Sequence, residues 1–309
     1  MFFFPYRIDT QLKGFPIVTL LICILCCYVY WQQYSADNRY FDAINQFCEH
    51  ELSKREAGWV DRLPAISDRD DCGSKLESIR KTEDAQTEIK RLARAVKPIE
   101  LFTSKKRNLQ YLEKQYTEIY AKFDQKVPQH LTAKLAYHPH DLDLTRMVTS
   151  TFSHGGIFHL IGNLSFFYIF AASVEIIFGS LAFVLFISVG TFGTSLAYSY
   201  VMDGVSNALP TVGLSGVVMS ALVALAIMMP TARIRCFLWF LIFFKRFRLP
   251  ALIIAAWYLG WDIYEINNMG DESYINYAAH ISGGAIGGIF GLYFLIFRRP
   301  RLKEARRTL

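Results

Sequence analysis

The sequence predicts an all-α membrane protein, a bundle of six transmembrane helices with a helical extramembrane domain inserted between the first helix and the second. Two observations support this fold class. Hydrophobic residues make up 52% of the 309 residues, and charged residues are dense from Asp37 to Asp143 but sparse from Thr145 onward. About 20 consecutive apolar residues cross a bilayer, and the chain contains several such runs. The profile is typical of a membrane protein with one polar domain and not of a soluble enzyme.

Six apolar runs follow one another along the chain. The fifth is the weakest candidate for a span, because Asp262 lies inside its end. The run over residues 236–244 is too short to cross a bilayer, and we interpret it as an interfacial piece between the fourth and fifth spans. The predicted spans are residues 15–31, 152–174, 176–201, 211–229, 249–264 and 275–297.

Basic residues predict the orientation of the spans, because Lys and Arg accumulate in cytoplasmic segments. They precede the first span, separate the fourth from the fifth and follow the sixth, whereas the connections 202–210 and 261–274 contain none. Both tails, residues 1–14 and the basic residues 298–309, are therefore predicted to be cytoplasmic. These flanking residues also explain the net charge of +6, so no nucleic-acid partner is implied.

The first span, residues 15–31, has an alternative interpretation as a cleaved signal peptide. A cut after Ala36 would place Tyr34 where the cleavage site needs a small residue, so we expect the span to be retained.

Residues 32–143 form the predicted outer domain. Apolar residues recur near helical spacing over 76–96 and over 109–123, and Pro98 separates the two runs, which predicts a helical hairpin. Cys48 and Cys72 are the only cysteines of this domain. They either pair in an oxidising compartment or remain free thiols, and the disulfide is the favoured interpretation. The domain either recruits a substrate or partner, or is a solvated insert without a ligand.

Polar residues at the outer ends of three spans are the candidates for chemistry. Ser215 lies between glycines in Gly213–Gly216, His159 and Asn163 share one face of the second span, and His280 belongs to the sixth. His159, Ser215 and His280 are each predicted roughly 6–12 Å below the outer surface, which places them in one layer. Such groups either line a functional cavity or only join helices by hydrogen bonds.

Small residues predict close packing of the fourth and sixth spans. Gly216, Ser220 and Ala224 recur at every fourth position of the fourth span, which allows another helix to approach closely. In the sixth span, His280 is expected to share a nearly bare face with three glycines, so that a side chain of the fourth span can touch the imidazole. These glycines are Gly284, Gly287 and Gly291.

A nucleophilic serine needs a base, and His280 is the only histidine of the last three spans. The tetrahedral oxyanion needs donors, for which His159, Asn163 and the backbone N–H of Ser215 are the candidates. No acidic residue in the membrane is expected to orient His280, so the prediction is a Ser–His dyad. His138 and His140 are interpreted as part of a loop, so no metal site is predicted.

At these positions the chain resembles the rhomboid intramembrane serine proteases. The family pattern has a histidine and an asparagine in the second core helix, a G-x-S-G serine in the fourth, and A-H-x-x-G-x-x-x-G in the sixth. The chain departs from it at Thr145, where the family has tryptophan, and at Met219, where an aromatic ring often stacks on the histidine. The matching residues are His159, Asn163, Gly213, Ser215, Gly216, Ala279, His280, Gly283 and Gly287, together with His154, Glu175 and Arg146 in supporting positions.

The resemblance covers the first span and residues 135–297, the core being 144–297, and it implies an integral membrane endopeptidase. Such an enzyme cuts transmembrane segments of protein substrates near the outer face, in contact with membrane lipid and without metal or cofactor. We expect the bacterial inner membrane, with the active site opening to the periplasm. The alternatives are a non-catalytic rhomboid-like protein that binds membrane clients, and a transporter or channel that uses the polar layer for permeation.

Overall fold

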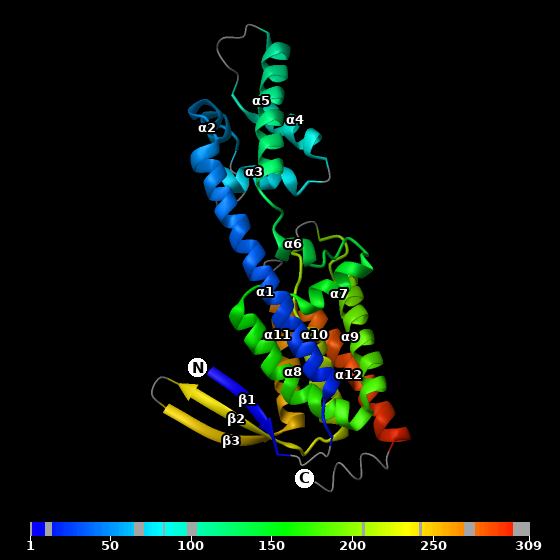
Figure 1. The fold of residues 1–309 in the computed structure, drawn as a ribbon. Helices are drawn as coiled ribbons and strands as arrows, with labels where there is room; N and C mark the ends of the chain where they lie inside the picture. The colour runs from blue at the N-terminus through cyan, green and yellow to red at the C-terminus, as the bar shows by residue number, and fades with distance from the viewer. Residues whose placement is uncertain are drawn as a thin grey trace. The chain divides into compact units, whose positions relative to one another are not determined.

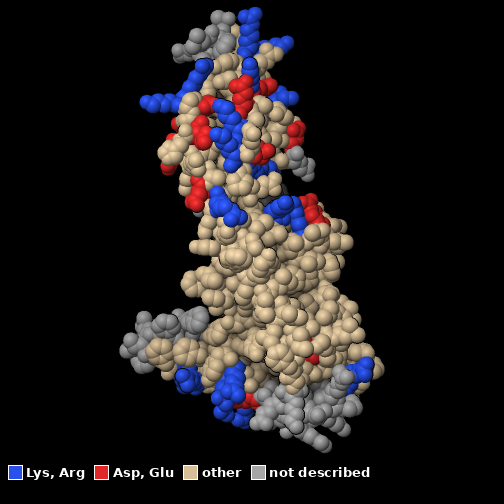
Figure 2. Space-filling view, in the orientation of Figure 1, with Lys and Arg blue, Asp and Glu red and all other residues tan. Residues whose placement is uncertain are grey.

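The computed structural model describes residues 2–9, 14–64, 71–82, 84–97, 104–205, 208–240, 243–268 and 276–298. The chain divides into two compact units. The first, which we call the membrane unit, is Met1–Gln33 with Thr132–Leu309, and the second, the polar unit, is Tyr34–Leu131. Figure 2 shows that Lys, Arg, Asp and Glu side chains are dense on the polar unit, whereas most of the helical part of the membrane unit shows none on the face drawn.

The membrane unit is a helix bundle, and the first part of α1 belongs to it (Figure 1). Among the residues that the structure describes, four helical segments are long and apolar enough to cross a membrane, namely Ile17–Glu51, α8, α9 and α12, so the chain is a multi-pass integral membrane protein. The predicted count of six spans is not established. The apolar helix α10 has only 14 residues, and α11 carries Asp262 and Glu265. The helices are α1 (Ile17–Gln46), α6 (Leu131–Leu135), α7 (Leu144–Phe152), α8 (Ile157–Phe178), α9 (Ser180–Val201), α10 (Ser215–Met228), α11 (Ala251–Asn268) and α12 (Tyr277–Phe297).

Helix α10 lies at the centre of the bundle, where nearly all of its residues are buried. It packs most closely on α12. A Cβ atom on Gly283 or Gly287 would overlap the backbone carbonyl of Gly216 or Ser220, respectively, and Gly291 lies against Ala224. Small residues at every fourth position therefore bring the two backbones together.

The prediction for the glycine face of the sixth span was wrong for one of its three glycines. Gly284 faces Leu259 of α11, and Gly283 takes its place in the row that faces α10. The contact row thus has a strict four-residue period, which matches the period of the small residues on α10.

Glu175 anchors the start of α1 and the junction of α8 with α9. Its carboxylate accepts hydrogen bonds from the backbone N–H groups of Val18 and Thr19 at 2.9 and 2.8 Å, and from the hydroxyls of Thr19 and Ser180 at 2.7 and 2.9 Å. The first N–H groups of a helix have no partner within it, and an anion is favoured there. The carboxylate therefore caps α1, while Gly179, with φ +82°, separates α8 from α9.

A three-stranded antiparallel sheet contradicts the all-α prediction, and residues 236–240 and 243–244 belong to its strands. The strands are β1 (Phe2–Ile8), β2 (Arg233–Phe240) and β3 (Phe243–Pro250), in the order β1-β2-β3. The missed signal is an alternation with period two in segments rich in aromatic residues, which favours strands. The arginines that alternate with Ile234 and Phe247 lie on either side of the apolar run, so the run itself does not show the alternation.

The polar unit has its own core, built around Leu76, Ile89, Leu92 and Phe123. The first predicted run is two helices instead of one, because Asp84 caps a new helix by accepting from the N–H of Gln86. Pro98, which was expected to separate the runs, lies outside the described residues. The elements are the second part of α1, a π-helical turn (Phe47–Glu51), α2 (Lys54–Asp61), α3 (Cys72–Arg80), α4 (Ala85–Ala95) and α5 (Lys105–Lys126).

Cys48 and Cys72 form a disulfide in this unit, with their Cα atoms 6.1 Å apart. The bond joins the π-helical turn to the first residue of α3. The sequence was compatible with a disulfide or with two free thiols, and the structure has the disulfide.

Candidate active site

Ser215 is the first residue of α10. The preceding residue is Leu214, and the chain reaches it through Gly213, whose φ of +125° is one that residues with a Cβ rarely adopt. The N–H of Gly213 donates to the carbonyl of Ser150 at 2.8 Å, which fixes this turn. Ser215 therefore lies at a helix N-terminus, where backbone N–H groups have no partner within the helix and the dipole favours negative charge.

His280 lies between Ser215 and an acidic residue. Its Nε2 is 2.8 Å from the hydroxyl oxygen of Ser215, and its Nδ1 is 3.1 Å from Oδ2 of Asp262 on α11. The carboxylate can only accept, so Nδ1 carries the proton and the lone pair of Nε2 faces the serine. The prediction that no acidic residue orients His280 was wrong. The sequence placed Asp262 near the outer end of its span, and α11 brings that end beside α12.

Three residues form a second group around the turn before Ser215. A Cβ atom on Gly213 would lie 2.9 Å from Nε2 of His159 and 3.4 Å from Nδ2 of Asn163. The amide nitrogen of Asn163 is buried and has no hydrogen-bond partner among the described residues. Nδ1 of His159 accepts from the N–H of Gly155 at 3.4 Å, so the neutral ring carries its proton on Nε2. Two side-chain donors thus converge on one point.

His154 packs behind this donor pair. Its ring meets the ring of His159 edge to face at 5.2 Å, and it is 1% exposed. The backbone of His154 is held by Gln33 of α1, whose side chain accepts from the N–H at 3.1 Å and donates to the carbonyl at 3.3 Å. Gln33 was not identified from the sequence. A lone glutamine near the end of a predicted span carries no signal until the loop that it binds is known.

A cavity of about 270 Å³ opens beside Ser215 and His280. Its walls come from α8, α10, α11 and α12, and they are apolar except where the candidate residues lie. An apolar hollow with a few converging polar groups is typical of a ligand-binding site. The lining residues are Gly162, Asn163, Phe166, Ser215, Val218, Met219, Leu222, Tyr258, Trp261, Asp262, Tyr277 and His280.

A smaller hollow of about 20 Å³ lies on the other side of Ser215. Ser150, Thr151, Thr194 and Ser195 line it, and Ser215 itself forms part of its wall. A polar hollow of this size is large enough for one water molecule.

A family model described as the Rhomboid domain matches residues 141–297, just over half of the chain. The chain belongs to the rhomboid family.

This rhomboid protein is 31% identical over 169 residues to Presenilin-associated rhomboid-like protein A, mitochondrial, of Danio rerio. It is 28% and 27% identical over 169 residues to the Presenilin-associated rhomboid-like proteins, mitochondrial, of Bos taurus and Homo sapiens. Each match covers 53% of this chain and 40% of the relative. The chain thus matches less than half of the length of these curated relatives.

Two residues from the family pattern lie away from the Ser215–His280 pair of the rhomboid. Arg146 forms ion pairs with Asp141 and Asp143 at 3.8 and 3.6 Å in and before α7. Glu175 caps α1 at the far end of α8. Both positions organise loops and helix ends and do not contact the reacting groups.

An aromatic ring does reach His280, although the expected position holds Met219. Tyr277, one helical turn before His280 on α12, meets the imidazole edge to face at 6.4 Å. Met219 lines the same cavity from α10. The aromatic contact to His280 that the family makes from the position of Met219 on α10 is thus made here by Tyr277 on α12.

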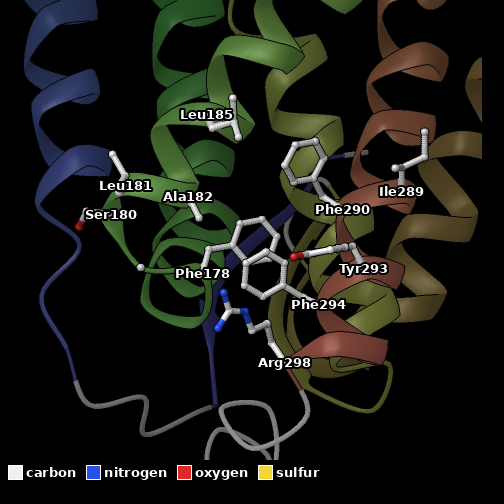
Figure 3. A pocket seen from close by; sticks show the side chains of 11 residues that line it. Phe178, Ser180, Leu181, Ala182, Leu185, Ile289, Phe290, Tyr293, Phe294 and Arg298 are labelled. Atoms are coloured by element: carbon white, nitrogen blue, oxygen red, sulfur yellow. The ribbon is translucent and has the colours of Figure 1, made fainter.

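Another cavity, of about 690 Å³, lies at the opposite ends of the same helices (Figure 3). Figure 3 shows that its side chains come from the α8–α9 junction and the last turns of α12, with Arg298 beside Phe178 and Phe294. It contains none of the candidate catalytic residues, so its size does not mark the active site.

Proposed function

We propose that this rhomboid protein is an intramembrane serine endopeptidase that cleaves transmembrane segments of membrane proteins near the outer face. The observation that carries the proposal is the 2.8 Å distance between the Ser215 hydroxyl and Nε2 of His280. A serine hydroxyl is a weak nucleophile until a base removes its proton, and the two groups are within hydrogen-bond reach.

In the proposed reaction Ser215 attacks the carbonyl carbon of the scissile bond, and its proton moves to Nε2 of His280. The imidazolium then gives that proton to the leaving amine as the C–N bond breaks, which leaves an acyl ester on Ser215. A water molecule, deprotonated by His280, hydrolyses the ester and restores the serine. Asp262 keeps the proton on Nδ1 and stabilises the imidazolium by its negative charge.

His159 and Asn163 are proposed to stabilise the oxyanion. Nε2 of His159 and the unpartnered amide nitrogen of Asn163 lie at the turn that leads into Ser215. The backbone N–H of Ser215, at the N-terminus of α10, is the third donor. Donors that are already in place when charge develops need no reorganisation, which is why such sites are effective.

The substrate is proposed to enter from the membrane between α8 and α11, which both line the cavity beside Ser215. A helix hydrogen-bonds its own carbonyls, so the substrate segment must unwind before its backbone reaches Ser215. The hollow behind Ser215, which serine and threonine residues line, is proposed to hold the hydrolytic water. The polar unit, residues 34–131, is proposed to recruit substrates or a partner outside the membrane.

The partners proposed are transmembrane proteins, in line with the names of the relatives, which describe those proteins as presenilin-associated. The relatives are also described as mitochondrial, which gives the expected bacterial inner membrane no support. We therefore propose only the orientation in the membrane. The basic segments lie on the cytoplasmic or equivalent side, and the end of the bundle that carries Ser215 lies on the opposite side of the membrane.

An activity-based fluorophosphonate probe tests the proposed nucleophile without requiring the natural substrate. We expect covalent labelling of Ser215, found by peptide mass spectrometry, in the parent protein and not in the His280→Ala variant. Labelling of neither protein would favour the non-catalytic client-binding alternative.

A further inference from the structure

The three strands of the sheet place arginines in a row. Arg7 of β1 pairs with Arg235 of β2, which pairs with Arg248 of β3. Side chains that are paired in register point to the same face of the sheet. Two residues farther along the strands, Arg246 and Arg233 belong to the same face, so five arginines share it.

The part of the opposite face that adjoins α11 is apolar and packs on the bundle. Ile8, Ile234 and Leu249 form the next row across the strands. Ile234 and Cys236 are fully buried in the core of the membrane unit, and Ile8, Phe247 and Leu249 pack against that core. The arginine face is thus directed away from the bundle, and four of its five arginines are exposed.

One carboxylate partly neutralises the arginine face. Asp9 forms an ion pair with Arg235 and a second with Arg248 at 3.2 Å. Within the described residues, no ion pair involves Arg7, Arg233 or Arg246. Like charges directly opposite each other destabilise a sheet, so folding alone gives no reason for this row. An anionic ligand that contacts several guanidinium groups would remove the repulsion.

The position of the sheet indicates which anion it meets. Ala251, the first residue of α11, directly follows β3, and β2 begins five residues after α10 ends at Met228. The arginines therefore lie at the membrane boundary, where Lys and Arg accumulate on the cytoplasmic side. In Figure 2, blue side chains gather at the end of the membrane unit that carries the sheet. Guanidinium groups bind phosphate by two hydrogen bonds at once.

We propose that the arginine face of the sheet, Arg7, Arg233, Arg235, Arg246 and Arg248, binds the phosphate headgroups of anionic phospholipids. Asp9 holds the row together and limits its net charge. The site is separate from the Ser215–His280 pair, and the proposal does not depend on protease activity.

Adjacent residues of β3 provide a matched test. Arg246 pairs with Phe237 on the arginine face, whereas Lys245 pairs with Leu238 on the other face, and both are exposed. Purified full-length protein in neutral detergent is titrated with phosphatidylglycerol and with phosphatidylcholine, and native mass spectrometry counts the bound lipid. We expect preferential retention of phosphatidylglycerol, reduced on the order of fivefold in Arg246→Gln and unchanged in Lys245→Gln.

Two further variants test whether lipid retention follows the charge of the arginine face. The double variant Arg7→Gln/Arg248→Gln should lose retention further, and Asp9→Asn should increase it, because the competing carboxylate is gone. Thermal unfolding in the same detergent checks that each variant is folded. Equal loss in Lys245→Gln, or no preference for phosphatidylglycerol, overturns the proposal. Displacement of the lipid by inorganic phosphate at equal concentration would assign the site to a soluble anion instead.

Discussion

Asp262 and His280 are joined across two helices by a hydrogen bond of 3.1 Å between Oδ2 and Nδ1. Asp262 is 5% exposed, so its carboxylate is shielded from solvent, and within the described residues its one hydrogen-bond partner is the imidazole. A buried carboxylate in this position holds one tautomer of histidine and favours the charged form that appears during catalysis. The site is therefore a Ser–His–Asp arrangement in geometry.

The first prediction concerns this carboxylate. Asp262→Asn should lower kcat on the order of a hundredfold or more with little change in KM, because the imidazolium loses its counter-charge while the cavity is unchanged. Glu265→Gln is the matched control, since Glu265 is also a buried acid, one turn along α11. Steady-state cleavage of one substrate by both variants measures the difference. Equal kcat values for the two would show that Asp262 does not act through His280.

The second prediction concerns the oxyanion donors. Asn163→Ala should lower kcat by about 10²- to 10³-fold, because the amide nitrogen is aimed at the site and has no other partner there. Ser173→Ala removes a buried polar group farther along the same helix and should leave kcat unchanged. Combining Asn163→Ala with Ser215→Ala should cause no further loss. A parallel rise in KM with constant kcat would instead assign Asn163 to substrate binding.

The third prediction concerns the contact of α10 with α12. Gly287→Ala should destabilise the folded protein by about 1–3 kcal/mol, because its Cβ would overlap the backbone of Ser220. Gly288→Ala should change stability by less than about 0.5 kcal/mol, since its Cβ would meet Ile227 at an ordinary 3.7 Å. Unfolding by denaturing detergent compares the two. Similar losses at both positions would show that the close approach of Gly287 to Ser220 is not what makes glycine necessary there.

The sequence was most informative where a local pattern has one physical meaning. Long apolar runs predicted α9 and α12 closely, and the four-residue spacing of Gly216, Ser220 and Ala224 identified the surface that meets α12. The candidate serine, both histidines and Asn163 lie together because each helix enters from the same side. These positions needed only helical periodicity and a common depth.

Contacts between distant elements could not be predicted in this way. The sequence shows that Asp262 is an unfavourable residue in a membrane span. The hydrogen-bond partner of its carboxylate, however, depends on how α11 packs against α12. β1 lies more than 220 residues before its partner β2, so no local pattern indicates the pairing. Gln33 and Tyr277 likewise acquire their roles only after the loops and helices are placed.

The fourth prediction concerns the polar unit and pH. Hydrogen bonds from Lys122 and Ser53 lower the pKa of Glu56 from 4.5 to about 2. A lowered pKa means that the ionised form stabilises the fold fully above pH 4.5, and that this contribution is lost as the pH falls toward 2. Limited digestion with pepsin should therefore cut α2 and α5 more slowly in the parent than in Glu56→Gln at pH 4.5. At pH 2 the two should be cut equally, and an undiminished difference there would contradict the assignment.

The most direct test of the account is cleavage of a model transmembrane substrate by purified protein in one detergent. The parent, Ser215→Ala and Ser220→Ala are compared, the last being a control serine on the same helix whose hydroxyl donates to the carbonyl of Gly216 at 3.1 Å. The account predicts cleavage within or beside the transmembrane segment by the parent and by Ser220→Ala, and none by Ser215→Ala. Equal cleavage by all three proteins, or cleavage by none, would contradict the claim that Ser215 is the nucleophile of an intramembrane protease.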